Sequence, residues 1–388
     1  MKEFSVTVAG GFLSTSLEFV EGPLTLVIDG GKIHSISRGI GGVLDLRSYV
    51  VMPPLANMHV HMLDYVSPEI GWDLDIDSVV GEPYGLKYLI LGRAGINSLN
   101  SVIDEAVGLM LSSGVGYVAE FRELGVGSLR LGTTKLRTHY VLGMPSKHAG
   151  VGHEIEEIIR YSDGIGISSP HYFTLEDLRI IFGLARSSGK LIHSHVSETR
   201  ETREERDLEK LLSAGKPDAL IHGVWLGSEE LQLLKDLRIT LVLCLRSNLW
   251  FMSGLPRLRN IYELGVDIAL GTDNLGWVKP DLWREGELLL LLARNAGIND
   301  PVWVLKALTN ANPVGVRNYI VEGGDANLLF LRYSNTPLER AHNKHLALVK
   351  RGGSEFVAAL MLGGKLMYLG GELEETVRES LRDYLSRW

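Results

Sequence analysis

From about residue 50 the chain alternates short apolar runs with longer segments whose apolar residues recur at the spacing of an α-helix. Each short run has the length of a buried strand, and this alternation is typical of repeated βα units around a parallel sheet. Eight such units over about 260 residues predict a (β/α)8 barrel, or TIM barrel. The candidate strands are 51–59, 115–121, 136–142, 164–168, 190–195, 218–223, 239–245 and 266–272.

Residues 174–188 show the helical pattern well. Thr174 precedes the segment and Asp177 follows three residues later, an arrangement typical of a helix N-terminus. Leu175, Leu178 and Ile181 recur on one face, so this helix is predicted to pack against the sheet. The pattern alone leaves a doubly wound open sheet as the alternative to a closed barrel.

Both ends of the chain show a different pattern of short β-branched or apolar runs separated by Gly-Gly pairs, which is typical of antiparallel strands joined by tight turns. We therefore predict an α/β chain with three parts. Residues 1–50 and 321–388 form one small composite β-sandwich domain, and residues 51–320 form the barrel. The amino-terminal runs are 4–8, 24–28 and 43–51; the carboxyl-terminal runs are 326–333, 345–350 and 356–371, followed by a predicted final helix over 373–388.

Composition narrows the partners and the compartment. The net charge is −8 and the basic residues are dispersed over the 388 positions, which argues against a nucleic-acid partner. The single cysteine, Cys244, cannot form an internal disulfide, so a reducing compartment is favoured. No apolar run approaches the roughly 20 residues needed to cross a bilayer, and the first residues lack a signal-peptide pattern. We expect a cytoplasmic protein that does not use a membrane.

Polar residues gather at the predicted carboxyl ends of the strands, where barrels of this kind place their active sites. His59 and His61 are two residues apart in an extended strand, so both imidazoles should point to the same face. His195 ends strand five and Asp273 follows strand eight. Imidazole and carboxylate are ligands for Zn²⁺ and Fe²⁺, so these four residues predict a site for one divalent metal ion.

The sequence resembles the amidohydrolase superfamily, and within it the cytosine deaminase-like and chlorohydrolase-like members that bind one metal. The resemblance rests on five motifs that follow one another along the chain. It extends to LVIDGGKIHSI before the barrel and VEGGDANLLFL after it. The five motifs are MPPLANMHVH at strand one, HVSET at strand five, IHGVWL at strand six, CLRSN at strand seven and LGTDN at strand eight.

The resemblance implies roles for individual residues. His59, His61 and His195 match metal ligands, and Asp273 matches a ligand that also handles the proton of the attacking water. Glu198 matches the proton shuttle to the leaving side of the substrate. A further histidine, His222, matches a strand-six residue that contacts the water or the substrate. Strand four ends GIGISSP without a lysine, so a bridging carboxylated lysine has no counterpart and a single metal is expected, zinc before iron.

Substrate contacts are harder to place. His171 follows strand four, where the family positions substrate-contacting groups. Trp72 and Glu82 lie in the long loop after His61, a suitable place for a lid, and His148 lies in a Gly-containing loop after strand three. Each could equally be an exposed residue. His193 faces the same way as His195, and the H-x-x-E spacing favours His195 as the ligand and a structural role for His193.

The resemblance implies a metal-dependent hydrolase of cyclic C–N bonds. We expect an aminohydrolase that releases ammonia from a purine, pyrimidine or related heterocycle. A ring-opening cyclic amidase of the imidazolonepropionase kind would use the same residues, and a non-catalytic metal-binding barrel is the third hypothesis. The expected partner is a small heterocyclic substrate, and self-association into a homo-oligomer is common among such proteins.

Overall fold

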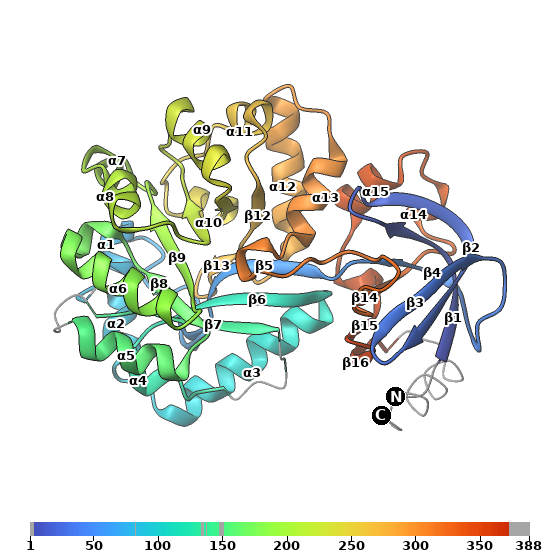
Figure 1. Cartoon of the computed structure of the whole chain (residues 1–388), viewed down its shortest axis with the longest axis horizontal. Helices are drawn as coiled ribbons and strands as arrows, with labels where there is room; N and C mark the ends of the chain where they lie inside the picture. The colour runs from blue at the N-terminus through green and yellow to red at the C-terminus, as the bar shows by residue number, and fades with distance from the viewer. Residues whose placement is uncertain (1–3, 82, 133–135, 137, 147–150, 372–388) are drawn as a thin grey trace.

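A closed ring of parallel strands forms the centre of the protein. The computed structural model describes residues 4–371 except 82, 133–135, 137 and 147–150. Within that part of the chain the strands follow one another in order around the ring, and β12 pairs with β5 to close it (Figure 1). The strands are β5 (Leu55–His61), β6 (Val115–Arg122), β7 (His139–Gly143), β8 (Gly164–Ile167), β9 (Leu191–Val196), β10 (Ala219–His222), β11 (Thr240–Leu243) and β12 (Ile268–Leu270), with the short β13 (Asp273–Asn274) beside β5. The predicted TIM barrel is confirmed, and the open sheet is excluded.

Helices cover the outside of the ring and connect its strands (Figure 1). Helix α6 carries the predicted capping box, in which the Thr174 side chain and Asp177 satisfy each other's backbone N–H groups, and it buries Leu178, Ile181 and Phe182. The connecting helices are α1 (Ile76–Val80), α2 (Leu86–Leu91), α3 (Ile96–Ser112), α4 (Gly125–Ser128), α5 (Val151–Tyr161), α6 (Leu175–Ser187), α7 (Arg200–Glu204), α8 (Asp207–Ala214), α9 (Ser228–Leu237), α10 (Leu245–Trp250), α11 (Leu258–Leu264), α12 (Leu282–Asn295) and α13 (Pro301–Thr309).

Both ends of the chain build one small sheet, as predicted. Among the described residues its strand order is β16-β15-β14-β4-β1-β2-β3, so carboxyl-terminal β14 pairs with amino-terminal β4. Its own apolar core includes Val6, Leu26 and Phe330. The strands are β1 (Phe4–Leu13), β2 (Glu18–Asp29), β3 (Lys32–Arg38), β4 (Leu44–Met52), β14 (Leu328–Arg332), β15 (Val357–Leu362) and β16 (Lys365–Leu369).

Two details of the predicted elements were wrong. The first barrel strand was expected over 51–59 but begins at Leu55, because residues 51–52 complete β4 and Pro53-Pro54 separates the two strands. The run 345–350 was expected as a strand but lies in helix α15 (Lys344–Arg351), which follows α14 (Pro337–Arg340). Asn343 caps α15 by accepting a hydrogen bond from the Leu346 N–H, which favours the helix over an extended run. The predicted helix over 373–388 lies outside the described residues.

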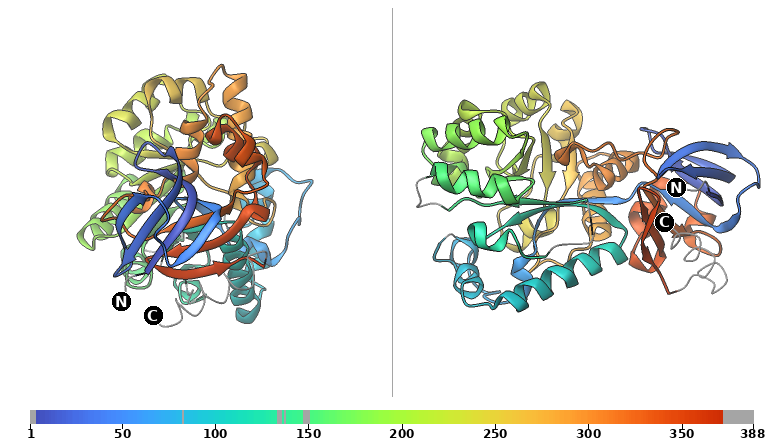
Figure 2. Two further views of the ribbon diagram at one scale, coloured as in Figure 1. Left: turned by 90° about the vertical axis from the view of Figure 1, so that its right-hand side faces the viewer. Right: turned by 60° about the horizontal axis from the view of Figure 1, so that its bottom comes forward.

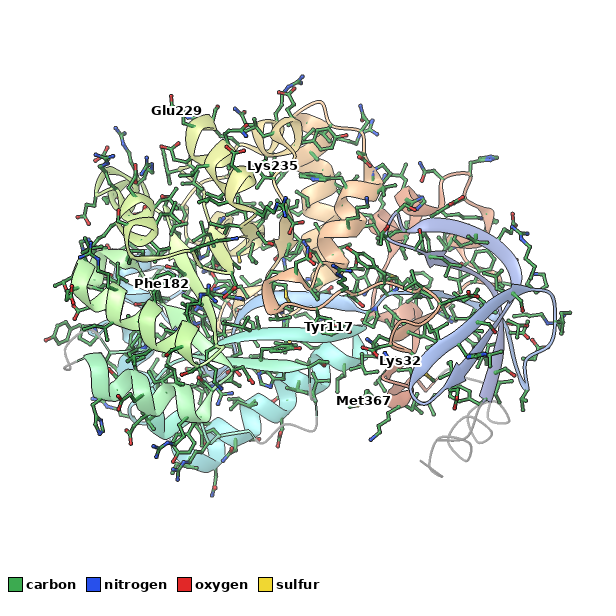
Figure 3. The ribbon with its side chains drawn as sticks, viewed as in Figure 1. Lys32, Tyr117, Phe182, Glu229, Lys235 and Met367 are labelled. Carbon is green, nitrogen blue, oxygen red and sulfur yellow. The ribbon has the colours of Figure 1, made fainter. Side chains whose placement is uncertain are left out.

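The sheet lies on the side of the barrel where β5 starts, so the carboxyl end of β5 points away from it (Figures 1 and 2). Tyr117 of β6 lies where the two parts meet, and its hydroxyl accepts a 2.6 Å hydrogen bond from the side-chain amide of Asn327 (Figure 3). Glu229, by contrast, is exposed on the outer helix α9. The carboxyl ends of the barrel strands are therefore free to carry a site.

Candidate metal and catalytic site

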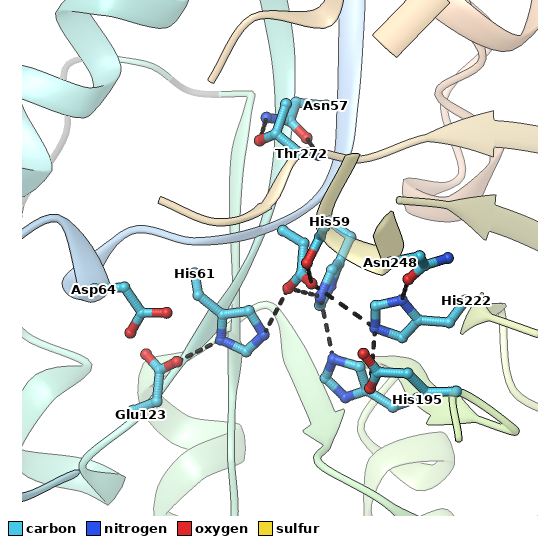
Figure 4. A network of polar contacts seen from close by, with 12 residues as sticks. Asn57, His59, His61, Asp64, Glu123, His195, His222, Asn248 and Thr272 are labelled. Atoms are coloured by element: carbon cyan, nitrogen blue, oxygen red, sulfur yellow. Dashed lines mark hydrogen bonds and ion pairs between the residues drawn. The ribbon is translucent and has the colours of Figure 1, made fainter. Parts of the chain in front are cut away.

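Four side chains converge at the carboxyl ends of β5 and β9 and in β13 (Figure 4). One ligand atom from each of His59, His61, His195 and Asp273 lies within 4.8 Å of all the others. His59 Nε2 is 3.1 Å from both Asp273 Oδ1 and His195 Nε2, and His61 Nε2 is 3.5 Å from Asp273 Oδ1. Three imidazole nitrogens and a carboxylate oxygen are a donor set that divalent transition metals accept, so these residues fit such an ion.

The barrel interior holds this cluster rigidly. The Phe121 ring lies edge-on to His59 at 4.6 Å and to His195 at 4.8 Å between centroids, and forms an apolar floor. Gly271 allows β12 to approach His59 closely, since a Cβ there would lie 2.8 Å from the His59 carbonyl oxygen. Asn57 also fixes the segment before Asp273, because it donates to Thr272 Oγ1 at 2.8 Å and accepts from the Thr272 N–H at 3.0 Å.

A second group of side chains faces the cluster. His222 Nε2 lies 3.5 Å from Glu198 Oε2 and 4.0 Å from Asp273 Oδ2. Its other nitrogen, Nδ1, is 2.8 Å from Asn248 Oδ1 and donates to it, so Nε2 of the neutral ring is left to accept a proton from Glu198. Ser247 donates a 2.5 Å hydrogen bond to Asp273 Oδ2. The residues that could bind a metal and those that could move protons therefore share one site.

The backbone is unusual at the same positions. Ser197, His222 and Asp273 adopt left-handed conformations, with φ of 47°, 69° and 62°. Non-glycine residues carry a cost of roughly 1–3 kcal/mol in such sparsely populated regions, and they cluster at functional sites. Asp207 stabilises the left-handed conformation of Ser197, because its carboxylate accepts hydrogen bonds from both the N–H and the hydroxyl of Ser197.

Burial sets the protonation of the site. It lowers the pKa of His59 to about 3 and that of His195 well below its ordinary value, which keeps both imidazoles neutral and able to bind a metal. Burial raises the pKa of Glu198. Burial would also raise the pKa of Asp273, but its hydrogen bond with His59 and the surrounding imidazoles outweigh that effect and hold the pKa well below its usual range. The structure thus contains a carboxylate base and a carboxyl group suited to be an acid.

The site opens into a pocket with about 780 Å³ of empty space, part of it open to solvent. Besides His61, His195, Glu198, His222 and Asp273, polar residues from several loops line it. These include Asp77, Lys87, Ser168, Ser169, Tyr172, Thr199, Thr202 and Asn274.

The predicted substrate residues lie elsewhere or cannot be placed. Trp72 is exposed, and His171 forms a half-exposed ion pair with Glu205; neither lines the pocket among the described residues. Glu82 and His148 lie outside the described residues. His193 is fully buried, and its Nε2 donates a 2.8 Å hydrogen bond to the Pro313 carbonyl oxygen, away from the cluster.

Sequence reasoning missed several residues that support the site. Ser247 and Asn248 belong to the CLRSN motif after strand seven, but no role followed from the motif alone. Glu123 stands directly after β6, and a carboxylate at that end of a barrel strand was a signal that could have been used. Lys87 comes from a distant loop helix and gave no local signal.

The fold and site together define a (β/α)8 barrel with a metal-binding donor set and acid–base residues at the carboxyl ends of its strands. The chain belongs to the amidohydrolase family, which it matches over residues 50–367.

Known proteins resemble the chain over nearly its whole length. A 5-methylthioadenosine/S-adenosylhomocysteine deaminase 2 of Archaeoglobus fulgidus is 33% identical over 354 residues, with 82% of each chain covered. The 5-methylthioadenosine/S-adenosylhomocysteine deaminase of Pyrococcus furiosus is 25% identical, with 97% of this chain and 98% of the other covered. A crystal structure of an adenosine deaminase from Xanthomonas campestris with bound zinc has a TM-score of 0.78 at 17% identity, with 99% of this chain and 98% of that chain covered. At that identity the match shows a shared fold.

Proposed function

We propose that this protein is a zinc-dependent aminohydrolase that removes an amino group from a small heterocycle as ammonia. The observation that carries the proposal is the shared site itself. His59, His61, His195 and Asp273 converge within 4.8 Å, and Glu198 faces the same place across His222. A donor set alone would suit a binding protein, whereas the buried base Asp273 and the partly buried acid Glu198 beside it suit catalysis.

His59, His61, His195 and Asp273 would hold the metal. When bound, a divalent zinc or iron ion supplies Lewis acidity that lowers the pKa of a water ligand from 15.7 to about 7. Zinc is favoured because imidazole nitrogens and carboxylate oxygens are among its usual protein ligands. The bound zinc of the Xanthomonas adenosine deaminase, which shares the fold, is consistent with this choice.

The residues of the chain then carry the protons. Asp273 is ionised and takes a proton from the water while the water oxygen attacks the carbon that bears the amino group. Burial raises the pKa of Glu198, which favours its acid form, and Glu198 would donate a proton to the adjacent ring nitrogen. His222 is held by Asn248 with Nε2 facing Glu198 and Asp273, so it can accept and return a proton between them. The amino nitrogen receives the proton that Asp273 took from the water, the C–N bond breaks, and ammonia leaves. The proton that remains on the new hydroxyl group returns to Glu198, which restores both carboxyl groups.

The lining of the pocket supports a small polar substrate. Polar side chains such as Asp77, Ser168 and Asn274 line it beside the metal-binding cluster. The Archaeoglobus and Pyrococcus proteins are named as deaminases of 5-methylthioadenosine and S-adenosylhomocysteine, so adenine nucleosides with a sulfur substituent are the first substrates to test.

No helix among the described residues is long and apolar enough to cross a membrane. We place the protein in the cytoplasm. We assign residues 51–320 to the catalytic barrel, apart from 51–52, which complete β4, and residues 1–50 and 321–388 to the β-domain.

The test is a panel of aminated heterocycles assayed with zinc-loaded protein. The panel contains 5-methylthioadenosine, S-adenosylhomocysteine, adenosine and guanine, with ammonia release and product mass measured together. An intact ring that has exchanged an amino group for oxygen supports the proposal. A ring-opened acid from a cyclic amide would instead indicate the amidase. Zinc bound in one equivalent with no turnover of any compound, including cyclic amides, would favour a non-catalytic barrel.

A further inference from the structure

A buried group of charges lies behind the candidate ligand His61, on the side away from the other ligands (Figure 4). Lys87 Nζ lies 2.6 Å from Glu123 Oε1 and 3.1 Å from Asp64 Oδ2. Glu123 Oε1 in turn forms a short hydrogen bond with His61 Nδ1. Their side chains are 5% exposed or less, and they come from three elements: the end of β6, helix α2 and the short helix at Leu63–Val66.

Stability is a poor reason for this arrangement. Removing several charges from water costs more than their mutual attraction regularly returns, and apolar residues of similar size would often serve as well. A buried charge group of this kind beside a site is better explained by what it does to the neighbouring histidine.

The geometry fixes both nitrogens of His61. Nδ1 donates a hydrogen bond to Glu123, and this directs Nε2 at the cluster, 3.5 Å from Asp273 Oδ1. His195 is held more weakly, since its Nδ1 is 3.3 Å from the Ile167 carbonyl oxygen, and His59 Nδ1 has no hydrogen-bond partner among the described residues. A carboxylate is the strongest of these acceptors, so His61 is the ligand whose orientation is most firmly set.

Lys87 does two things at once. Its ammonium group provides the counter-ion of the buried Glu123 carboxylate beside the site. It also lines the substrate pocket and belongs to α2, in the loop segment between β5 and α3 that borders this pocket. The position of this segment is thereby tied to the position of a metal ligand.

We infer that Glu123 is a positioning residue that holds His61 in its metal-binding tautomer and orientation, and that Lys87 keeps Glu123 in place. The inference rests on the proposed function in so far as it takes His61 as a metal ligand. It adds a supporting pair that acts through the ligand and does not touch the substrate carbon.

The experiment measures zinc affinity by competition with a chromophoric chelator, starting from metal-free protein, so that its readout is independent of turnover. Glu123→Gln keeps the shape of the side chain but removes its charge. The zinc dissociation constant should rise by about 10–100-fold, the usual effect of losing such a partner. Lys87→Gln should raise it by at least about fivefold, because Glu123 then loses its counter-ion.

The matched control is Glu120→Gln. Glu120 lies in β6, three residues before Glu123, and is equally buried. It pairs with Arg122 and His139 on the other face of β6 and does not contact the cluster. This variant should lose stability yet bind zinc within about threefold of the wild type. Urea unfolding of each metal-free variant separates lost stability from lost affinity.

The outcomes are distinct. The inference is overturned, while the proposed function stands, if Glu123→Gln binds zinc within about threefold of the wild type. It is also overturned if Glu120→Gln weakens zinc binding as much as Glu123→Gln does. If Glu123→Gln does not fold, Lys87→Gln decides, and unchanged affinity overturns the inference. A wild-type protein that binds no zinc overturns the proposed function and the inference with it.

Discussion

Replacing Glu198 with glutamine removes one proton from the site and almost nothing else. The side chain keeps its length, and its amide oxygen can still accept hydrogen bonds. Glu198 is not one of the four proposed metal ligands, so zinc content should remain at one equivalent. Because Glu198, His222 and Asp273 also bring ligand atoms within 4.8 Å of one another, zinc is measured in the same samples. Any loss of activity would therefore report the proton step.

The size of the effect follows from the position of Glu198. Its Oε2 lies 3.5 Å from His222 Nε2, and Glu198 lines the pocket beside the cluster. A positioned general acid contributes about 10²–10⁴-fold in rate, and its loss should raise the barrier by about 3–5 kcal/mol. The KM should change little, because the amide still fills the same place.

The pH dependence gives a second readout of the same variant. Burial raises the pKa of Glu198, and the acid works only when protonated, so the wild-type kcat should fall as pH rises through that raised pKa. Glutamine does not titrate, so the residual activity of Glu198→Gln should lack this alkaline decline. Ammonia release at saturating substrate, measured across pH with zinc content determined in parallel, provides both results. A variant that retains more than about a third of the wild-type kcat with full zinc would refute the assignment of Glu198 as the acid.

Three further changes test the surroundings of the site. Asn248→Ala removes the partner that orients His222, so kcat should fall about 10–100-fold with zinc content unchanged, and an unaltered kcat would contradict that role. Gly271→Ala places a methyl group 2.8 Å from the His59 backbone oxygen and should lower the free energy of unfolding by about 1–3 kcal/mol. The control Gly183→Ala has no atom within 4 Å of the new Cβ and should be neutral or stabilising. Equal urea midpoints for the two variants would contradict this prediction. The pKa of His59 is lowered from 6.5 to about 3 in the folded protein, so the free energy of unfolding of the metal-free protein should fall by up to about 5 kcal/mol as pH drops from 6.5 toward 3. In a His59→Gln variant the free energy of unfolding should depend less steeply on pH. An unchanged pH dependence in urea unfolding would contradict the role of His59.

The sequence was most informative where a periodic pattern and a strand end coincide. Alternation along β5 placed His59 and His61 on one face, and the rule that barrel sites lie at the carboxyl ends of strands brought in His195 and Asp273. The structure places all four together. The boundaries were less certain, because the apolar run at 50–52 serves β4 and only the Pro-Pro pair marks the change of strand.

What the sequence could not provide is the second layer of contacts. Residue types that support a ligand are unremarkable in themselves, and their meaning depends on which strands become neighbours. Glu120 and Glu123 illustrate the difficulty, since both are buried carboxylates on or next to β6 and only the strand's alternation separates them. Residues 120 and 122 face one way and form an ion pair, whereas 121 and 123 face the other, toward His59 and His61.

That alternation also limits how the site could have been assembled. Phe121 closes the floor under His59 while Glu123, two residues on, reaches the back of His61, so a shift of β6 by one residue would exchange the apolar floor and the carboxylate for Glu120 and Arg122. An arginine beside the imidazoles would repel a metal ion. The register of β6 against β5 is therefore a condition of the site as well as of the core. Paired with Lys87 from α2, Glu123 makes metal binding depend on the register of a strand and on the position of a loop helix at once.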